Sequence, residues 1–414
     1  MRRPRLFAAL AALVVGGCDN TTPPGLDAAV PQDTPLADHV DAADDHADTG
    51  DGRDAPLPCG EITAQALGVG WNHSLAVQTD GTLRAWGANG SGQLGRGDQV
   101  DAPRAVPIEP GVSRWRAVAG GSRHACGIRE DGALWCWGVN VHGQLGTGNT
   151  DDRTRPVRVG DETDWVEVVC GGLHSCGVRA GGSLWCWGAN PAGQLGLGAR
   201  TGDRLTPQRV GAEDGWHGLA AKARFNCALR PDDSLWCWGD NSDGQLGLGD
   251  TTDRLAPTAT APGARWTQVA MGPLHTCAIR VDGALFCWGL NDFGQLGAGD
   301  TLSRTMPQRI GADTGWQRVA GGFEHTCAIG ADRALWCWGN NAVAQLGVGG
   351  AATRQTPTRV GVDGVTGVVT GQGHTCVLDT TGTVRCWGDN VSGQAGHDDR
   401  TRARAEPGTV CATP

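Results

Sequence analysis

Three things are missing from this sequence, and each absence removes a class of protein. Its formal charge is −10, so positive charge is not in excess, which argues against a nucleic-acid binder. Its N-terminal apolar run, residues 6–15, is far shorter than the roughly 20 residues that a membrane-spanning helix needs. Its 67 glycines and 21 prolines lack the strict period of collagen, and their abundance favours a turn-rich β protein over a helical bundle.

The first 17 residues have the layout of a secretory signal peptide. Three arginines precede the apolar run, which ends in Val15-Gly16-Gly17-Cys18. This ending resembles the bacterial lipobox, in which the cysteine is lipidated and becomes the mature N-terminus. We therefore expect a signal peptide over 1–17 and a lipid anchor on Cys18. The protein would be extracytoplasmic, on the periplasmic side of a bacterial membrane or on the cell surface. An ordinary signal peptide cleaved nearby is the alternative.

Residues 18–58 have the composition of a disordered tether. Positions 19–58 contain ten aspartates, one arginine, no lysine and no aromatic residue, so they lack the apolar surface that offsets the entropy of ordering. Without this segment and the three arginines of the signal peptide, the formal charge of the remainder is −4. Most of the acidity therefore belongs to the tether, and nothing in the folded region resembles a basic stripe for phosphates.

The dominant feature of the remaining chain is an internal repeat of about 50 residues. The motif Trp-Gly-x-Asn occurs seven times, and each copy leads into a Gly-Gln-Leu-Gly segment, which is weaker in the last two units. The tryptophans of the motif are Trp86, Trp137, Trp187, Trp238, Trp288, Trp338 and Trp387. Seven copies of one glycine-rich loop favour turns of a repeated scaffold over a phosphate-binding site.

Apolar runs and turn residues place four short strands in each unit. In the second unit these are 115–119, 125–129, 133–137 and 156–159. In Leu134-Trp135-Cys136-Trp137 both faces of the strand are apolar, as expected for a sheet packed between two neighbouring sheets. The sequence therefore predicts an all-β fold: a seven-bladed β-propeller of four-stranded antiparallel blades over 59–411, with a short tail at 412–414.

The combined pattern of His-x-Cys, Asp-Gly, Trp-Cys-Trp-Gly-x-Asn and Gly-Gln-Leu-Gly resembles the regulator of chromosome condensation repeat family over roughly residues 60–411. The resemblance implies a propeller. The eukaryotic founder of that family is a chromatin-bound nucleotide-exchange factor, but this chain differs from it in compartment, charge and cysteine content, so its activity and functional residues are not carried over. A secreted bacterial β-lactamase inhibitor protein shares the architecture, which makes protein capture by a propeller face the better model.

Twelve of the sixteen cysteines form pairs that are ten residues apart, one pair in each unit from the second to the seventh. The pairs are Cys126 with Cys136, Cys176 with Cys186, Cys227 with Cys237, Cys277 with Cys287, Cys327 with Cys337, and Cys376 with Cys386. A three-residue hairpin turn places the two members opposite each other, within reach of a disulfide. The alternative is a metal site in each blade, because a histidine stands two residues before the first cysteine.

Differences between the units favour disulfides over metal. In the first unit Leu75 and Ala85 replace both cysteines while His73 remains, and in the fourth unit Phe225 replaces the histidine while both cysteines remain. The cysteines therefore vary together and independently of the histidine. We expect disulfides, no metal and no cofactor, and we assign the histidines to structural hydrogen bonds at the start of a strand.

Two further cysteines, Cys59 and Cys411, flank the array at the same point of the repeat. The two ends of a closed ring must meet, so we predict a disulfide between them that locks the propeller. Cys170 is left over, and in a secreted protein it is either a buried thiol or the donor of an intermolecular bond.

A binding site is expected where the repeats differ, because the shared residues are explained as scaffold. The positions before the repeated histidine vary most, and we expect them in equivalent loops on one face. The fourth unit departs furthest, since it carries the only lysine of the chain. The candidate face comprises Leu173, Lys222, Arg224, Phe225, Leu274, Phe323 and Glu324, an apolar patch with a basic centre. Neutral drift in exposed loops is the competing explanation.

These observations predict a monomeric cell-envelope lipoprotein whose propeller face binds an unidentified protein, in the envelope or outside the cell. Its only link to a membrane would be the lipid anchor, and no nucleic acid would be involved. We expect no catalytic residues, because no pairing of nucleophile and base stands apart from the repeat. The alternatives are an extracytoplasmic hydrolase or lyase with a site in the central channel, and a purely structural envelope protein.

Overall fold

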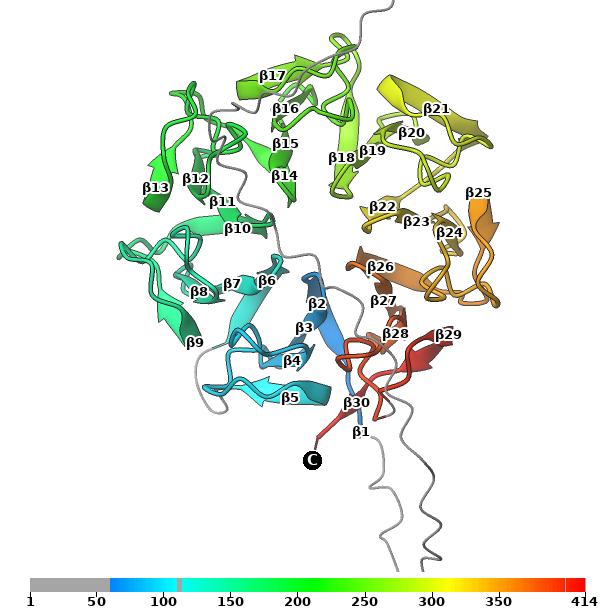
Figure 1. Ribbon diagram of the computed structural model, residues 1–414, viewed down its shortest axis with the longest axis horizontal. Coiled ribbons are helices and arrows are strands. Elements are labelled where there is room, and N and C mark those ends of the chain that lie inside the picture. Colours follow the sequence, from blue (N-terminus) through cyan, green and yellow to red (C-terminus); the bar gives the residue numbers. More distant parts are fainter. Residues whose placement is uncertain (1–59, 110–113, 399, 414) are drawn as a thin grey trace, which may run out of the picture. The chain divides into compact units, whose positions relative to one another are not determined.

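The computed structural model describes residues 60–109, 114–398 and 400–413, and these form seven sheets arranged around a central channel (Figure 1). Each blade is an antiparallel sheet of four consecutive strands, as the repeat predicts, although the sheet of the first blade gains two short strands at its edge. The signal peptide, Cys18, the tether and Cys59 lie outside the described residues. All strands of the propeller lie within residues 60–412, so a fragment of residues 58–414 contains the whole fold.

The inner strand of each blade lines the channel. These strands are β2 (Ala64–Val69), β6 (Trp115–Gly120), β10 (Trp165–Cys170), β14 (His217–Lys222), β18 (Trp266–Met271), β22 (Arg318–Gly321) and β26 (Val365–Thr370). The second strands are β3 (His73–Gln78), β7 (His124–Arg129), β11 (His174–Arg179), β15 (Phe225–Leu229), β19 (His275–Arg280), β23 (His325–Ile329) and β27 (His374–Asp379).

The third and outer strands complete the blades. The third strands are β4 (Leu83–Gly87), β8 (Leu134–Gly138), β12 (Leu184–Gly188), β16 (Leu235–Gly239), β20 (Ala284–Gly289), β24 (Leu335–Gly339) and β28 (Val384–Gly388). The outer strands are β5 (Ala102–Ile108), β9 (Arg153–Arg158), β13 (Arg204–Arg209), β17 (Arg254–Thr260), β21 (Arg304–Thr314), β25 (Arg354–Arg359) and β29 (Arg404–Thr409). In the second unit the outer strand begins three residues before the predicted 156–159, because arginine and threonine rather than apolar residues open it.

All six predicted hairpin disulfides are present. In each, the two cysteines face each other directly between the second and third strands, and their Cα atoms are 4.1–4.2 Å apart. In the first blade Leu75 lies opposite Ala85 in the same register. The cysteines are therefore not available as metal ligands. Cys170 is a buried thiol, and burial raises its pKa to about 12.

The ring closes at the edge of the first blade. Strand β1 (Gly60–Glu61) pairs with β30 (Cys411–Ala412), and Ala412 pairs in turn with Ala105 of β5. On the other side, the amide of Ala64 donates to the carbonyl of Gly382 in the seventh blade, 2.8 Å away. The two ends of the array meet as predicted. Cys411 is disulfide-bonded, while its predicted partner Cys59 lies outside the described residues.

Tryptophan joins each blade to the one before it. The indole Nε1 of every Trp-Gly-x-Asn motif donates to the main-chain carbonyl of a Gln in the glycine loop of the preceding blade, at 2.9–3.1 Å. All seven of these tryptophans are fully buried. The ring is thus sealed by one repeated polar contact inside an apolar interface, which satisfies the only polar atom of the indole.

A second set of contacts between blades uses the repeated histidine. His124, His275 and His325 place Nε2 at 2.9–3.1 Å from a serine or threonine hydroxyl of the next blade. His174 meets Asn226, and His374 meets Ser74 across the closure. The expectation of structural hydrogen bonds is therefore confirmed for five histidines, whereas His73 faces the blade in which Ala125 replaces the hydroxyl residue.

Candidate functional site

The inner strands all finish at one end of the channel, which we call the mouth. There, residues 70–72 and their six equivalents connect each inner strand to the second strand, and the longer loops between third and outer strands emerge at the same end. Of the predicted face, Leu173, Arg224, Leu274, Phe323 and Glu324 lie in these connections. Leu173 is 37% exposed and Arg224 is exposed, whereas Leu274, Phe323 and Glu324 are half-buried.

Two residues of the predicted face do not lie on it. Phe225 is the first residue of β15 and is fully buried, packed with Trp266 and Met271 of the fifth blade. Lys222 ends β14, and its Nζ donates to the carbonyl of Thr370, 3.2 Å away in the seventh blade. Because these two blades face each other across the channel (Figure 1), the lysine spans it. The predicted surface patch with a basic centre is therefore wrong: its cation lies inside the channel.

A steric rule explains why these two positions change together. In the other six blades the position of Lys222 is glycine, and a Cβ built there would lie 2.0–2.3 Å from Cε1 of the histidine in the same blade. No side chain fits under that ring. In the fourth blade Lys222 carries a Cβ, and Phe225 stands in place of the histidine. Glycine with histidine and lysine with phenylalanine are thus two alternative solutions of one packing problem.

This rule predicts the behaviour of a double variant. Phe225→His alone should destabilise the propeller by about 2 kcal/mol, because the new ring meets the Cβ of Lys222. Adding Lys222→Gly should restore most of that loss, since it recreates the pair found in the other blades and leaves Thr276 as a hydroxyl partner. Urea denaturation of the two single variants and the double variant measures the coupling free energy. A coupling below about 0.5 kcal/mol would show that the two positions are independent.

An aromatic pair that sequence reasoning missed lies at the mouth. Trp71 of the first blade and Phe323 of the sixth meet edge to face, with ring centroids 5.4 Å apart. The seventh blade lies between theirs in the ring, and its Gln372 amide donates to the Trp71 carbonyl at 2.9 Å. The pair therefore bridges over the seventh blade, on the side of the channel that the Lys222 amine reaches. Trp71 was visible in the sequence as a tryptophan in a variable loop.

The two charged residues of the predicted face that lie at the mouth, Arg224 and Glu324, already have polar partners. Arg224 lies between Leu173 and Leu274 in blade order and forms an ion pair with Asp240 at 3.4 Å. Glu324 accepts from the Asn340 amide at 2.6 Å. The mouth thus combines one aromatic pair, separate leucines and polar groups that are already partnered, which is the mixed composition of a protein-binding surface.

The channel below the mouth has a distinctive electrostatic character. It contains a cavity of about 270 Å³ lined by the inner strands, with Lys222 among the lining residues. Burial lowers the pKa of Lys222 to about 8. Burial also lowers the pKa of His73, His124, His275, His325 and His374 to about 3, and that of His174 to about 4. At neutral pH the six histidines are uncharged, and Lys222 is the cation of this region.

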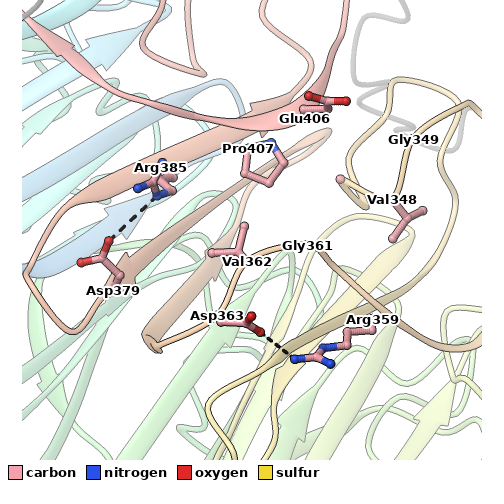
Figure 2. Close-up of a pocket in the computed structure, with 11 residues that line it drawn as sticks. Val348, Gly349, Arg359, Gly361, Val362, Asp363, Asp379, Arg385, Glu406 and Pro407 are labelled. Carbon is pink, nitrogen blue, oxygen red and sulfur yellow. Dashed lines mark hydrogen bonds and ion pairs between the residues drawn. The ribbon is translucent and has the colours of Figure 1, made fainter.

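A larger hollow lies between the sixth and seventh blades at the outer side (Figure 2). Its volume is about 640 Å³, against about 350 Å³ for the equivalent hollow lined by Trp165 and Trp185. Val365 and Arg385 replace those two tryptophans in the seventh blade, so the space stays open. Arg385 lies 3.9 Å from Asp379, and Arg359 lies 2.7 Å from Asp363, so four of the charged residues that line this hollow pair with one another, whereas Glu406 forms no ion pair within the described residues.

Two features are absent from the described ranges. No group of three or more histidine, cysteine, aspartate or glutamate residues is placed to hold a metal ion among residues 60–109, 114–398 and 400–413. In the same part of the chain, no helix is long and apolar enough to cross a membrane.

Comparison with known proteins identifies the repeat. A family model of the regulator of chromosome condensation (RCC1) repeat matches residues 80–128, 131–178, 181–220, 232–279, 282–329 and 333–378. A second model of the same repeat matches seven segments, from 65–93 to 365–394. The ultraviolet-B receptor UVR8 of Arabidopsis thaliana is 33% identical over 203 residues, which are 45% of this chain and 44% of that protein. The human E3 ubiquitin-protein ligase HERC2 is 30% identical over 190 residues, 45% of this chain but 3% of its own length.

Solved structures show the same fold. Yeast RCC1 (Prp20), in a crystal structure with Kap60 bound, superposes with a TM-score of 0.71 at 20% identity, covering 90% of this chain and 92% of that one. Human WBSCR16 superposes with a TM-score of 0.69 at 24% identity, covering 77% and 87%. The chain spans less than half of the curated relatives named above, but the repeat models cover well over half of it. The chain belongs to the regulator of chromosome condensation repeat family.

Proposed function

We propose that this protein is a cell-envelope lipoprotein that binds another protein at the mouth of its propeller. The observation that carries the proposal is the Trp71–Phe323 pair, because two large aromatic side chains from separate blades meet in loops that the scaffold does not require. Aromatic residues placed centrally on a surface are typical anchors of protein interfaces. A propeller of this repeat family is a protein-interaction scaffold type, and a yeast protein of the same fold has been crystallised with Kap60 bound.

The location and the absence of catalysis are part of the same proposal. The predicted signal peptide, the predicted lipid anchor at Cys18 and the predicted tether support a place in the envelope, and six hairpin disulfides fit an oxidising compartment. Binding without chemistry is supported by the repeated histidines. They are fully buried and hold the blades together, so they are poor candidates for general bases.

Capture of envelope proteins tests the proposal. A fragment of residues 58–414 is immobilised, exposed to an envelope extract of the organism, and its retained protein is identified by mass spectrometry. Affinity for that protein is then measured for Trp71→Ala and Phe323→Ala. We expect each variant to lose at least about tenfold in affinity, because interface anchors are worth about 2 kcal/mol or more.

The control is Val281→Asp, which changes an exposed apolar residue in a hairpin turn at the opposite end of the fifth blade. It should bind like the parent chain, and thermal unfolding should show all three variants folded. If both aromatic variants bind as the parent does, or if Val281→Asp abolishes binding, the mouth is not the interaction surface.

A further inference from the structure

The single lysine of the chain, Lys222, lies in the central channel at a position where the other blades have glycine. Lysine and arginine together number 34, and all but Lys222 are arginine. Lys222 stands where every other blade has glycine, and accommodating it removes a histidine contact between the fourth and fifth blades. Neutral drift would more readily preserve glycine, because Lys222 requires the second change at Phe225.

The surroundings of the Lys222 amine leave it short of partners. An ammonium has three donors, and one of them meets the Thr370 carbonyl. In the part of the chain that the structure describes, no carboxylate lies within ion-pair distance of this nitrogen, and only burial shifts its pKa. The neighbouring channel positions include Val69, Cys170 and Met271, which supply no anion. Lys222 is half-buried and lines the channel cavity, so an anion in that cavity would meet an ammonium with donors to spare.

The cavity beside the amine sets the size and nature of that anion. Its walls are formed mainly by valine, alanine, glycine and leucine of the inner strands, and its volume of about 270 Å³ admits a small organic acid. The Nζ lies near the mouth, so a charged group is held there while a short aliphatic portion lies among the small side chains of the inner strands. A single ammonium favours a carboxylate over a phosphate, which would need several donors.

We propose that the channel is a carboxylate-binding site in which Lys222 pairs with the carboxylate of a short aliphatic chain. That group belongs either to a free short-chain fatty acid or to an acidic side chain or C-terminus that a partner inserts through the mouth. Free carboxylates alone test the site, whereas a carboxylate inserted by a partner rests on the protein capture proposed above.

The test uses the fact that the chain has one lysine. Lysine labelled with ¹³C and ¹⁵N is incorporated into the fragment of residues 58–414, so every side-chain signal comes from Lys222. Sodium butyrate is titrated against sodium chloride at equal ionic strength. We expect a saturable shift of the Lys222 Cε signal with butyrate alone, and a rise of the lysine pKa by about one unit or more as the carboxylate binds. Equal shifts with both salts, or no saturable shift, would overturn the proposal.

Two variants test whether Lys222 binds butyrate in protein that is still folded. Lys222→Met retains the length of the side chain without its charge, and the double variant Lys222→Gly with Phe225→His restores the pair of the other blades. Both should remain folded by circular dichroism and lose butyrate binding by more than tenfold in calorimetry. Binding retained in either folded variant would show that Lys222 is not the anchor.

A chain-length series separates the two sources of the carboxylate. Affinity that rises about fourfold for each added methylene, from acetate to hexanoate, indicates a free aliphatic acid. Affinity that is the same for all lengths indicates a carboxylate presented by a larger partner, with only its charged tip in the channel. Binding of the proposed protein partner that survives Lys222→Met would leave the mouth as the interaction surface and restrict the channel to free acids.

Discussion

Lowering the pH from 7.5 to 4.5 is expected to destabilise the propeller by on the order of 10 kcal/mol, comparable to the whole stability of most domains. The cause is the set of six buried histidines, whose pKa values burial lowers from 6.5 to about 3 or, for His174, about 4. They stay neutral in the fold, whereas the unfolded chain takes up a proton at each as the pH falls below 6.5. Their contribution to stability is therefore complete above pH 6.5 and is lost toward pH 3 to 4.

Urea denaturation at a series of pH values from 7.5 downward, as far as the folded state persists, measures this dependence. Its slope should approach six protons taken up on unfolding, at about 1.4 kcal/mol per pH unit for each proton. His325→Gln should reduce the slope by one proton. Equal urea midpoints at pH 7 and pH 5 would contradict the burial of neutral histidines.

Gly322→Ala is expected to destabilise the protein by about 3 kcal/mol or more, a large effect for a single methyl group. A Cβ at this position would lie 2.1 Å from Cε1 of His325. That ring cannot retreat easily, because it is fully buried and its Nε2 lies 3.1 Å from the Thr375 hydroxyl of the next blade. The new methyl group must therefore displace the ring and break a contact between two blades.

Gly361→Ala provides the matched control, since a Cβ there meets nothing within 4 Å and the backbone is not left-handed. Its stability should stay within about 0.5 kcal/mol of the parent. The two variants differ only in the space around the added carbon, so similar urea midpoints for both would refute the steric rule.

The repeat predicted the architecture well because each blade is an independent copy of one local design. Hydrophobic runs and turn residues act within about 50 residues. A strand that is unclear in one unit is therefore placed by comparison with the other six. The hairpin disulfides follow from register alone, since Cys126 and Cys136 are fixed opposite each other by the turn between them. Strand ends were less certain: β9 begins with Arg153 and Thr154, which carry no apolar signal.

The candidate site could be predicted only in part, for two physical reasons. First, whether a residue belongs to a strand or to the loop after it decides where its side chain lies. Lys222 falls on the last position of β14 and therefore enters the channel instead of the surface. Second, the repeat fixes the burial of a position whatever residue occupies it. Phe225 is buried because the histidines at the equivalent positions of the other blades are buried.

The Trp71–Phe323 contact illustrates a further limit. The two residues belong to blades that are not neighbours, and each is unremarkable in its own repeat. Their meeting depends on how three consecutive blades are arranged around the ring. An alignment of the seven units compares equivalent positions, and it says nothing about side chains that cross over an intervening blade.

The hairpin disulfides have a mechanical consequence if the protein is held by one end, as we propose. Each bridge closes the chain between the second and third strands of its blade, so force applied to the termini cannot extend the ten-residue segment inside it. At about 3.4 Å per residue, each bridged blade withholds about 34 Å of contour length. A stretched chain would thus keep six small hairpins intact, and each would be a template on which its blade re-forms when the tension is released.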